Sequence, residues 1–530
     1  MKKFFFIFLL IPFLSSALPF ESQNVSISGP SIHMKETVER VYKSGGNVVD
    51  MAVASALVLS VVTPFYVSLG AGGFALVDMG DDVTALDFRE MAPKSFHPDY
   101  YKDKSSVKGG SAVGVPGFVA GLWSLHQKYG KLSWRLLFKE AIELAEKGHP
   151  VGTEWVRITK EISILDYGMA QFFKRGDPYK SGDLFKQQKL AKALKLIRDK
   201  NIKGFYQGKV AQDVVNSVNN YGGSLSLEDL KDYEVRWLKP IEKDFMHYTV
   251  YSMPPPSSGG IVLAGALDLI HQKKLSKQKL LSLNEIHLLS EIMSRAFRSR
   301  SLIADPDFYT TPFDQILSVE YLKKMSDSIA VQKVKNLKPL KETTHFVVMD
   351  KEGKTVTMTL TLNLRYGSKV VTPQYGIVLN NQMDDFTTRL NQPNSFGLIQ
   401  GQGNKVEAGK RPLSSMSPTL VKDGKKTIMA LGGSGGPRII SGVLQVLYRS
   451  LVNELDIDQA IQFPRIHHQF LPRKTYVEKN RFSPDLLKML SKRKHKIEDA
   501  KSVGKIYGVR RDEILSSAFD HRGDGVAWGF

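Results

Sequence analysis

Two neighbouring stretches of the chain show the polar–apolar alternation of β-strands, and a polar turn separates them. Residues 342–350 form the first stretch, and 351–354 supply a charged turn that contains glycine. In the second stretch, 355–363, every second residue is threonine or asparagine, so the polar side chains share one face. The pattern predicts a β-hairpin with an unusually polar face.

The position of the turn fixes how this hairpin pairs. If the turn is centred on Glu352, antiparallel pairing places Thr343 opposite Thr361, with Asn363 one step beyond. Three polar groups then meet at one end of a sheet. The hairpin alone favours a structural interpretation, because threonine is a good strand former and threonine pairs are common on sheet surfaces.

Helical and strand patterns fill the rest of the chain without a proline-rich linker, a low-complexity tract or a repeat. The predicted helices are 33–43, an apolar helix capped by Asn47, basic helices within 155–235, 261–270 and a helix that opens at Ile439. The predicted strands outside the hairpin are 75–79 and 84–90. The length of 530 residues would suggest about three domains, but one large α/β body fits the unbroken pattern better.

The first seventeen residues have the pattern of a secretory signal. A lysine pair precedes the apolar run 4–13, and the small residues of Ser15–Ala17 follow it. A membrane anchor fits less well, because the run is far shorter than the roughly 20 residues of a span and contains Pro12. Residues 1–17 are therefore predicted to be a signal peptide of a periplasmic or secreted protein.

Composition narrows the chemistry. The chain has no cysteine, which excludes a disulfide, a zinc–thiolate site and a thiol nucleophile. A formal charge of +20 is compatible with nucleic-acid or membrane-surface binding, so a cationic binding protein without catalytic activity is one alternative. The charges are spread, however, and the densest run, 492–496, lacks interleaved aromatic residues and is typical of a solvated helix face. We expect no nucleic-acid partner and no membrane span.

Two motifs contain candidate binding groups. Arg89, in the string Asp-Phe-Arg-Glu, would on its own be expected to pair with Asp87 or Glu90 at the surface. The segment 379–386 offers three amides and two carboxylates, but it lacks the ligand spacing and the terminal glutamate of a calcium loop. Neither motif indicates a metal site.

Glycine and histidine pairs provide two further candidates. Gly435 and Gly436 follow a predicted strand and free two backbone N–H groups, as an oxyanion hole requires. A phosphate-binding loop is the alternative, but no Lys-Ser/Thr pair follows and Pro437 removes a donor. The adjacent histidines 467–468 would point to opposite sides of a strand, so we expect packing or surface roles and no joint metal site.

The hairpin and these motifs together resemble the γ-glutamyltransferase family, nearly from end to end. The strings that carry the resemblance are Thr-Thr-His-Phe at 343–346, Asp-Phe-Arg-Glu at 87–90, Asn-Asn-Gln-Met-Asp-Asp at 380–385, Lys-Arg-Pro-Leu-Ser-Ser-Met-Ser-Pro at 410–418 and Gly-Gly-Ser-Gly-Gly at 432–436. The resemblance implies an N-terminal-nucleophile hydrolase of four-layer αββα architecture that cuts its own precursor. The cut would fall between Glu342 and Thr343 and give a large piece, 18–342, and a small piece, 343–530, within one globular body.

The resemblance also implies the site residues. Thr343 would be the nucleophile, with Thr361 beside it, and its freed α-amino group, with an ordinary pKa of roughly 7.7–8.0, would accept the hydroxyl proton. Gly435 and Gly436 would stabilise the oxyanion. The remaining residues would hold the α-amino and α-carboxylate groups of the substrate: Arg89, Asn363, Gln382, Asp385, Ser414 and Ser415.

The implied reaction is the transfer of a γ-glutamyl group from glutathione, or a similar amide, to water or to an amino acid or peptide. No cofactor or metal ion is expected, and the partners are the substrate, the acceptor and the two pieces of the chain. A β-lactam (cephalosporin) acylase or a polyglutamate-processing enzyme would share the fold and the threonine. The residues implied to hold a free α-amino group and a free α-carboxylate favour γ-glutamyl substrates over those of the two alternatives.

One residue departs from the family pattern. Phe396 stands where members with a lid loop usually carry a tyrosine that bonds to the asparagine matching Asn363. Phenylalanine cannot make this bond, although it can still cover the site. We therefore expect a lid that opens more often and an enzyme that favours hydrolysis over transfer.

Overall fold

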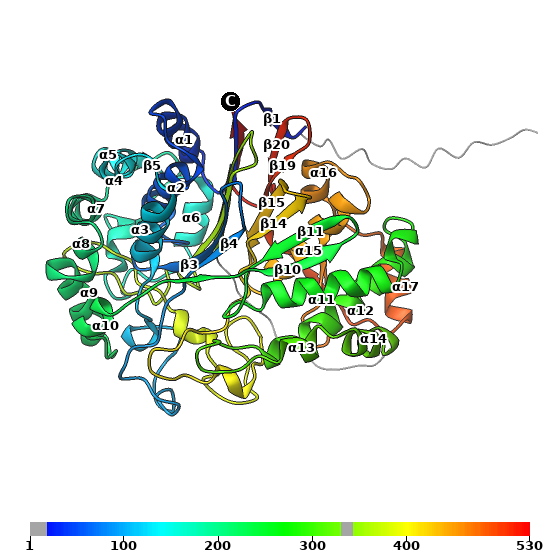
Figure 1. The fold of residues 1–530 in the computed structure, drawn as a ribbon. Coiled ribbons are helices and arrows are strands. Elements are labelled where there is room, and N and C mark those ends of the chain that lie inside the picture. Colours follow the sequence, from blue (N-terminus) through cyan, green and yellow to red (C-terminus); the bar gives the residue numbers. More distant parts are fainter. Residues whose placement is uncertain (1–17, 330–342) are drawn as a thin grey trace, which may run out of the picture.

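The computed structural model describes residues 18–329 and 343–530, and two antiparallel sheets lie face to face at its centre (Figure 1). Sheet 1 has the order β1 (Phe20–Ser22), β20 (Leu515–Phe519), β19 (Lys505–Arg511), β15 (Lys426–Ser434), β14 (Thr419–Asp423), β11 (Tyr248–Ser252) and β10 (Ile241–Phe245). Sheet 2 has the order β21 (Val526–Gly529), β2 (Val25–Gly29), β12 (Thr344–Asp350), β13 (Thr355–Thr361), β3 (Gly72–Asp78), β4 (Thr84–Phe88) and β9 (Arg236–Leu238). Three small sheets contain β16 (Ile466–His467), β17 (Thr475–Glu478) and β18 (Ile497–Ala500); β5 (His149–Pro150) and β8 (Leu184–Phe185); and β6 (Phe173–Lys174) and β7 (Asp177–Pro178).

Helices cover the outer face of each large sheet, which gives the predicted four-layer αββα arrangement (Figure 1). The helices on the side of sheet 2 are α1 (His33–Lys43), α2 (Val48–Val62), α3 (Phe118–Tyr129), α4 (Trp134–Leu137), α5 (Lys139–Lys147), α6 (Thr153–Thr159), α7 (Gln188–Lys200), α8 (Lys203–Tyr206), α9 (Gly208–Asn220) and α10 (Leu227–Lys231). Those on the side of sheet 1 are α11 (Gly259–Gln272), α12 (Leu283–Ala296), α13 (Phe313–Ile316), α14 (Val319–Asp327), α15 (Arg438–Leu451), α16 (Ile457–Gln462) and α17 (Pro484–Lys492).

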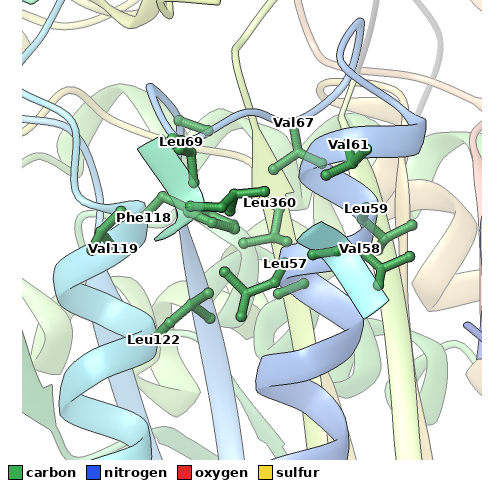
Figure 2. Packing of buried hydrophobic residues seen from close by; sticks show 14 of the residues in the cluster. Leu57, Val58, Leu59, Val61, Val67, Leu69, Phe118, Val119, Leu122 and Leu360 are labelled. Carbon is green, nitrogen blue, oxygen red and sulfur yellow. The ribbon is translucent and has the colours of Figure 1, made fainter. Parts of the chain in front are cut away.

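Helix α2 shows how the sequence specifies one of these layers. Asn47 caps its first turn in a reciprocal pair with Asp50, and every residue of the helix is buried. A helix that is apolar all round must lie inside a protein, and α2 packs between α1, α3 and sheet 2. Figure 2 shows Leu57 of α2 beside Leu360 of β13 and near Phe118 of α3.

The hairpin β12–β13 has the predicted register. Thr344 pairs with Leu360, so Thr343, the residue before the strand, comes opposite Thr361. Val356, Met358 and Leu360 face the helices, because they belong to the core beneath α2. The threonines of β13 alternate with these residues and therefore face sheet 1, in the space between the two sheets.

Some boundaries differ from the sequence-based expectations. Strand β13 ends at Thr361, and Asn363 lies in a turn with a positive φ of 78°. The prediction for 492–496 was wrong, because α17 ends at Lys492 and the next residues form a turn in which Lys494 has a φ of 66°. Basic residues are favoured at the C-terminus of a helix, so this run marks a helix end and not a helix face.

Two expectations fall on residues outside the described ones: the signal peptide, 1–17, and Glu342 on the N-terminal side of the predicted cut. Within 18–329 and 343–530, no helix has the length and apolar character needed to cross a membrane.

Candidate active site

The candidate nucleophile lies at the entrance to strand β12. Thr343 is 4% exposed, and its Oγ1 is 3.3 Å from Oγ1 of Thr361 on the adjacent strand. The Thr361 oxygen accepts a hydrogen bond of 2.8 Å from the backbone N–H of Asn363. The three polar groups predicted to meet at the sheet end therefore do so.

His345 fixes the neighbouring polar face between the two sheets. Its Nδ1 lies 2.8 Å from Oγ1 of Thr359 and its Nε2 lies 3.1 Å from Oγ1 of Thr357. Complete burial lowers the pKa of His345 to about 3, so the ring stays neutral. Gly432 of the facing sheet leaves space for the ring, since a Cβ there would lie 2.3 Å from it. His345 thus supports the threonine face, a role that its position in the motif did not reveal.

Two buried charges, Arg89 and Asp385, line the same cavity as Thr343. Arg89 is 1% exposed, and its Nη2 pairs with Oδ2 of Asp385 at 2.7 Å. Nε of Arg89 donates to the carbonyl of Pro412, and Nε2 of Gln382 donates to the same Asp385 oxygen at 2.9 Å. Burial raises the pKa of Asp385, while the guanidinium of Arg89 opposes this change. The expectation that Arg89 alone would form a surface pair was wrong, because the chain brings Asp385 to it from a distant segment.

Several polar atoms beside this pair have no partner among the described residues. These are the hydroxyl of Ser415 and the side-chain oxygen of Gln382, both buried. Ser414 accepts a hydrogen bond from the backbone N–H of Met416, which leaves its own hydroxyl proton free to donate. Buried polar groups are normally satisfied, so unpaired ones in a cavity are suited to a polar ligand.

An ion-pair network anchors the segment that carries these serines. Nη1 of Arg411 contacts Asp87 at 2.7 Å, and its backbone N–H donates to Asp305 at 2.7 Å. Arg236 bridges Asp87, Asp305 and Asp307. Asp305 and Asp307, which flank Pro306 in the sequence, therefore both bind arginine.

The paired glycines form a tight turn before helix α15. Gly435 and Gly436 have φ values of 129° and 58°, a region that favours glycine. Neither backbone N–H has an acceptor in the described parts of the chain. A Cβ on Gly436 would lie 2.6 Å from the ring of Phe396, and one on Gly435 would lie 3.1 Å from Cα of Gly504. Both positions therefore require glycine for backbone geometry and for space.

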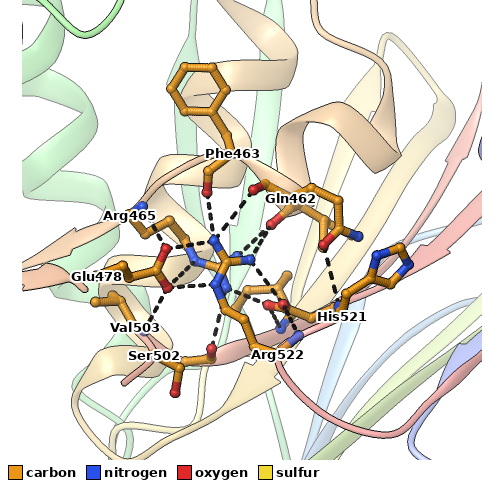
Figure 3. Close-up of polar contacts among 12 residues, drawn as sticks. Gln462, Phe463, Arg465, Glu478, Ser502, Val503, His521 and Arg522 are labelled. Carbon is orange, nitrogen blue, oxygen red and sulfur yellow. Dashed lines mark hydrogen bonds and ion pairs between the residues drawn. The ribbon is translucent and has the colours of Figure 1, made fainter. Parts of the chain in front are cut away.

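A buried charge network holds the loop that packs against this turn, and Figure 3 shows the polar contacts of the network. Arg522 pairs with both Glu478 and Asp520, and Arg465 also pairs with Asp520. Glu478 accepts from the backbone N–H of Val503, which holds the loop against which Gly435 packs. The network thus connects the C-terminal residues to the glycine turn.

The lid residue Phe396 covers the site from the side of the glycine turn. Asn394 of the same loop donates to Asp385 at 3.2 Å, and Gln469 donates to the carbonyl of Gly397 at 3.2 Å. The side chain of Gln469 is held in turn by His467, at 2.8 Å. The Phe396 ring is thus an apolar wall of the cavity, and the loop that carries it is attached through Asn394 and Gln469.

These groups enclose one small cavity. It is lined by Arg89, Arg300, Thr343, Thr361, Asn363, Gln382, Asp385, Phe396, Leu398, Ser414, Ser415, Met416, Gly436, Pro437 and Ile439. Ten of the eleven predicted site residues are therefore together, while Gly435 lines a neighbouring cleft with Gly504. The volume is about 20 Å³, which is room for water but not for a glutamyl group.

Arg300 is the site residue that the sequence analysis missed. It is 4% exposed, Nη1 donates to Gln400 at 2.8 Å, and burial lowers its pKa to about 10. It belongs to a run with Arg295 and Arg298 that has the appearance of an ordinary basic helix surface. Only the packing of this segment against the lid loop distinguishes the three arginines.

A facing pair of antiparallel sheets between helix layers, with a threonine at a strand entrance inside a cavity, defines the class of N-terminal-nucleophile hydrolases. Within the described residues, no group of three or more histidine, aspartate or glutamate side chains is arranged to hold a metal ion. The family model for gamma-glutamyltranspeptidase matches residues 35–530. The chain belongs to the γ-glutamyltranspeptidase family, whose members are enzymes of hydrolase and transferase type.

Individual relatives agree with this assignment. The chain is 36% identical to the glutathione hydrolase proenzyme of Pseudomonas aeruginosa, over 97% of this chain and 96% of that protein. The structure of Helicobacter pylori gamma-glutamyltranspeptidase matches with a TM-score of 0.55 and 35% identity, over 60% of this chain and 93% of that one. Cephalosporin acylase from Bacillus halodurans matches with a TM-score of 0.87 over 99% of both chains, but at 24% identity this likeness concerns the fold alone.

Proposed function

We propose that this protein cleaves itself between Glu342 and Thr343 and then acts on glutathione and other γ-glutamyl amides through Thr343. The observation that carries the proposal is the cavity itself. Its lining contains both Thr343 and the Arg89–Asp385 pair, together with the unpartnered atoms of Ser415 and Gln382. This arrangement matches a substrate with a reactive carbonyl at one end and a free amino-acid head at the other.

The chemistry follows from these positions. After cleavage, the α-amino group of Thr343 takes the proton from its own hydroxyl, and Oγ1 attacks the γ-carbonyl carbon. The unbound N–H groups of the glycine turn stabilise the negative oxygen of the intermediate. The C–N bond breaks, the leaving amine receives the proton and an ester forms on Thr343. Water or an acceptor amine then attacks the ester and regenerates the threonine.

Charge complementarity supports a glutamyl head group. Arg89 offers a planar donor to the α-carboxylate, with the hydroxyls of Ser414 and Ser415 close by. Asp385 offers a negative charge to the α-ammonium group, and Gln382 an amide oxygen. When the substrate enters, its two charges replace the contact that Arg89 and Asp385 make with each other.

The proposed compartment is the periplasm or the extracellular space. It rests on the pattern of residues 1–17, which has the lysine pair, the short apolar run and the small residues of a secretory signal. Glutathione hydrolysis there would act on exported γ-glutamyl compounds.

A matched pair of substrates tests the head-group assignment. A γ-glutamyl anilide and a glutaryl anilide differ only in the α-amino group. We expect kcat/KM to be about 30- to 1,000-fold higher for the γ-glutamyl compound, since one charged contact contributes roughly 2–4 kcal/mol. Equal or faster release from the glutaryl compound would contradict the proposal and favour an acylase. Release of glutamate from glutathione, measured in parallel, tests the natural amide.

A further inference from the structure

A second cavity, which we call the basic cavity, lies between α12, the C-terminal end of α17 and the loop after β16. Figure 1 shows α12 and α17 on the side of sheet 1. Its volume is about 360 Å³. It is lined by Glu291, Ser294, Arg295, Arg298, Ser328, His468, Phe470, Arg473, Thr475, Arg493, Lys494, His495 and Lys496. Six arginine and lysine residues thus face one carboxylate.

Most of these positive charges are not neutralised by the protein. Glu291 is paired with Arg295 at 2.9 Å. Arg298, Arg473 and Lys496 have no ion-pair partner in the parts of the chain that the structure describes. Like charges that gather in a concave surface repel one another and create a strong positive potential, which an anion would relieve.

The loop after β16 has a strained backbone at Phe470, and the ring of this residue contacts two of the arginines. Phe470 has a φ of 68°, which is rare for a bulky residue. Its ring lies 5.9 Å from the guanidinium carbons of both Arg298 and Arg473. The ring therefore holds two arginines on one side of the cavity. Backbone strain of this kind persists where the surrounding structure requires a particular geometry.

The floor of the basic cavity contains neutral hydrogen-bonding groups. His468 is 6% exposed, and its Nδ1 accepts a hydrogen bond from the backbone N–H of Phe470, so the ring proton lies on Nε2. Burial, together with nearby positive groups that include Arg473, lowers the pKa of His468 to about 3. His495 is likewise held neutral by burial, with a pKa of about 4, and contacts Thr475 at 3.2 Å.

We propose that the basic cavity is a binding site for a small multivalent oxyanion of the phosphate or sulfate type. Planar guanidinium groups suit tetrahedral oxyanions, because they offer paired donors at a fixed spacing. The rim lysines add charge, and the cavity has room for a phosphate or a small phosphate ester. The site is separate from the catalytic cavity and shares no lining residue with it.

Calorimetric titration with inorganic phosphate at neutral pH tests this proposal, with sodium chloride at equal ionic strength as the control for screening. The parent protein should bind phosphate saturably, at a stoichiometry of one. The double variant Arg298→Gln/Arg473→Gln should bind at least about tenfold more weakly, because two of the six charges are lost. A matched control, Lys192→Gln/Lys200→Gln, removes the same charge from exposed positions of α7 and should bind like the parent.

The outcomes are distinguishable. Loss of binding in the arginine variant, with the lysine variant and the γ-glutamyl activity unchanged, would support the site. Two results would overturn it: no saturable phosphate binding by the parent, or equal binding by both double variants. Tight binding of a single-stranded oligonucleotide without measurable phosphate binding would also overturn it, because an extended nucleic-acid surface would then be the better account. None of these results depends on whether Thr343 is the nucleophile.

Discussion

The catalytic cavity and the basic cavity arrange their charges in opposite ways. In the catalytic cavity, Arg89 already has Asp385 as a partner at 2.7 Å, and the space between the walls is about 20 Å³. In the basic cavity, several cations have no ion-pair partner in the described chain, and the space is about 360 Å³. A site with an ion pair such as Arg89–Asp385 suits a ligand that carries both charges. A site whose cations lack ion-pair partners suits an anion.

The two cavities meet at one short segment. His467 contacts Gln469, which donates to the carbonyl of Gly397 in the loop beside the catalytic cavity. His468 and Phe470 line the basic cavity instead. The two histidines thus lie in different surroundings: His467 contacts Ser441 and Gln469, while His468 lines the basic cavity.

Removal of the nucleophile should have the largest effect on activity. It should affect the function of the catalytic cavity but not that of the basic cavity. Thr343→Ala is expected to give an uncleaved, inactive chain, because the same hydroxyl starts both the self-cleavage and the attack on substrate. Phosphate binding in the basic cavity should not change. Thr344→Val is the matched control: Thr344 is buried and its hydroxyl has no partner among the described residues. Electrophoresis measures the cleavage of both variants, and an assay measures their γ-glutamyl activity. Normal cleavage of Thr343→Ala would refute the assignment of Thr343 as the nucleophile.

The head-group pair can be tested with the two anilide substrates. Asp385→Asn should reduce kcat/KM for the γ-glutamyl anilide by an amount that corresponds to roughly 2–4 kcal/mol, because the ammonium group loses its counter-ion. The same variant should have much less effect on the glutaryl anilide, which lacks the ammonium group. Arg89→Lys should impair both substrates, since both keep the carboxylate. Equal losses on both substrates for Asp385→Asn would mean that the residue only maintains structure.

Glu90, which is next to Arg89 in the sequence, offers a test of how burial affects a carboxyl group. Its two oxygens are buried without partners in the described chain, and burial raises its pKa to about 8. Between pH 4.5 and 8 the folded state retains a proton that the unfolded state releases, so the stability contributed at Glu90 decreases as the pH rises. The free energy of unfolding of Glu90→Gln, measured relative to that of the parent, should therefore rise between pH 4.5 and pH 8. The expected rise is on the order of 2–4 kcal/mol. A difference in melting temperature that does not vary with pH would contradict this.

The lid should show the smallest effect. Phe396→Tyr adds a hydroxyl near Asn363, and one neutral hydrogen bond contributes roughly 0.5–1.5 kcal/mol. The ratio of transfer to hydrolysis should rise modestly, because a lid that stays closed longer keeps water from the ester. Product partitioning with glycylglycine as acceptor measures this ratio. An unchanged or lower ratio would mean that the contacts of Asn394 and Gln469 already determine closure.

The sequence was sufficient for the hairpin register because a single turn position decides it. Motif residues such as Asp385 and Ser415 could be assigned from resemblance, although no local pattern indicates that they share a cavity with Thr343. Arg300 and the basic cavity were not predictable, because both depend on contacts between segments far apart in the chain. The run 492–496 was misinterpreted for the same reason: its charges are local, but the cavity they face is formed by other elements.

The central claim is that Thr343 becomes a chain terminus and the nucleophile. Its most direct test is N-terminal sequencing of the purified protein after denaturing electrophoresis, together with the intact mass of each band. We predict two bands, with the smaller one beginning Thr343-Thr344-His345 and running to Phe530. A single uncleaved chain that nevertheless hydrolyses γ-glutamyl amides, or a smaller band that begins elsewhere, would contradict this account.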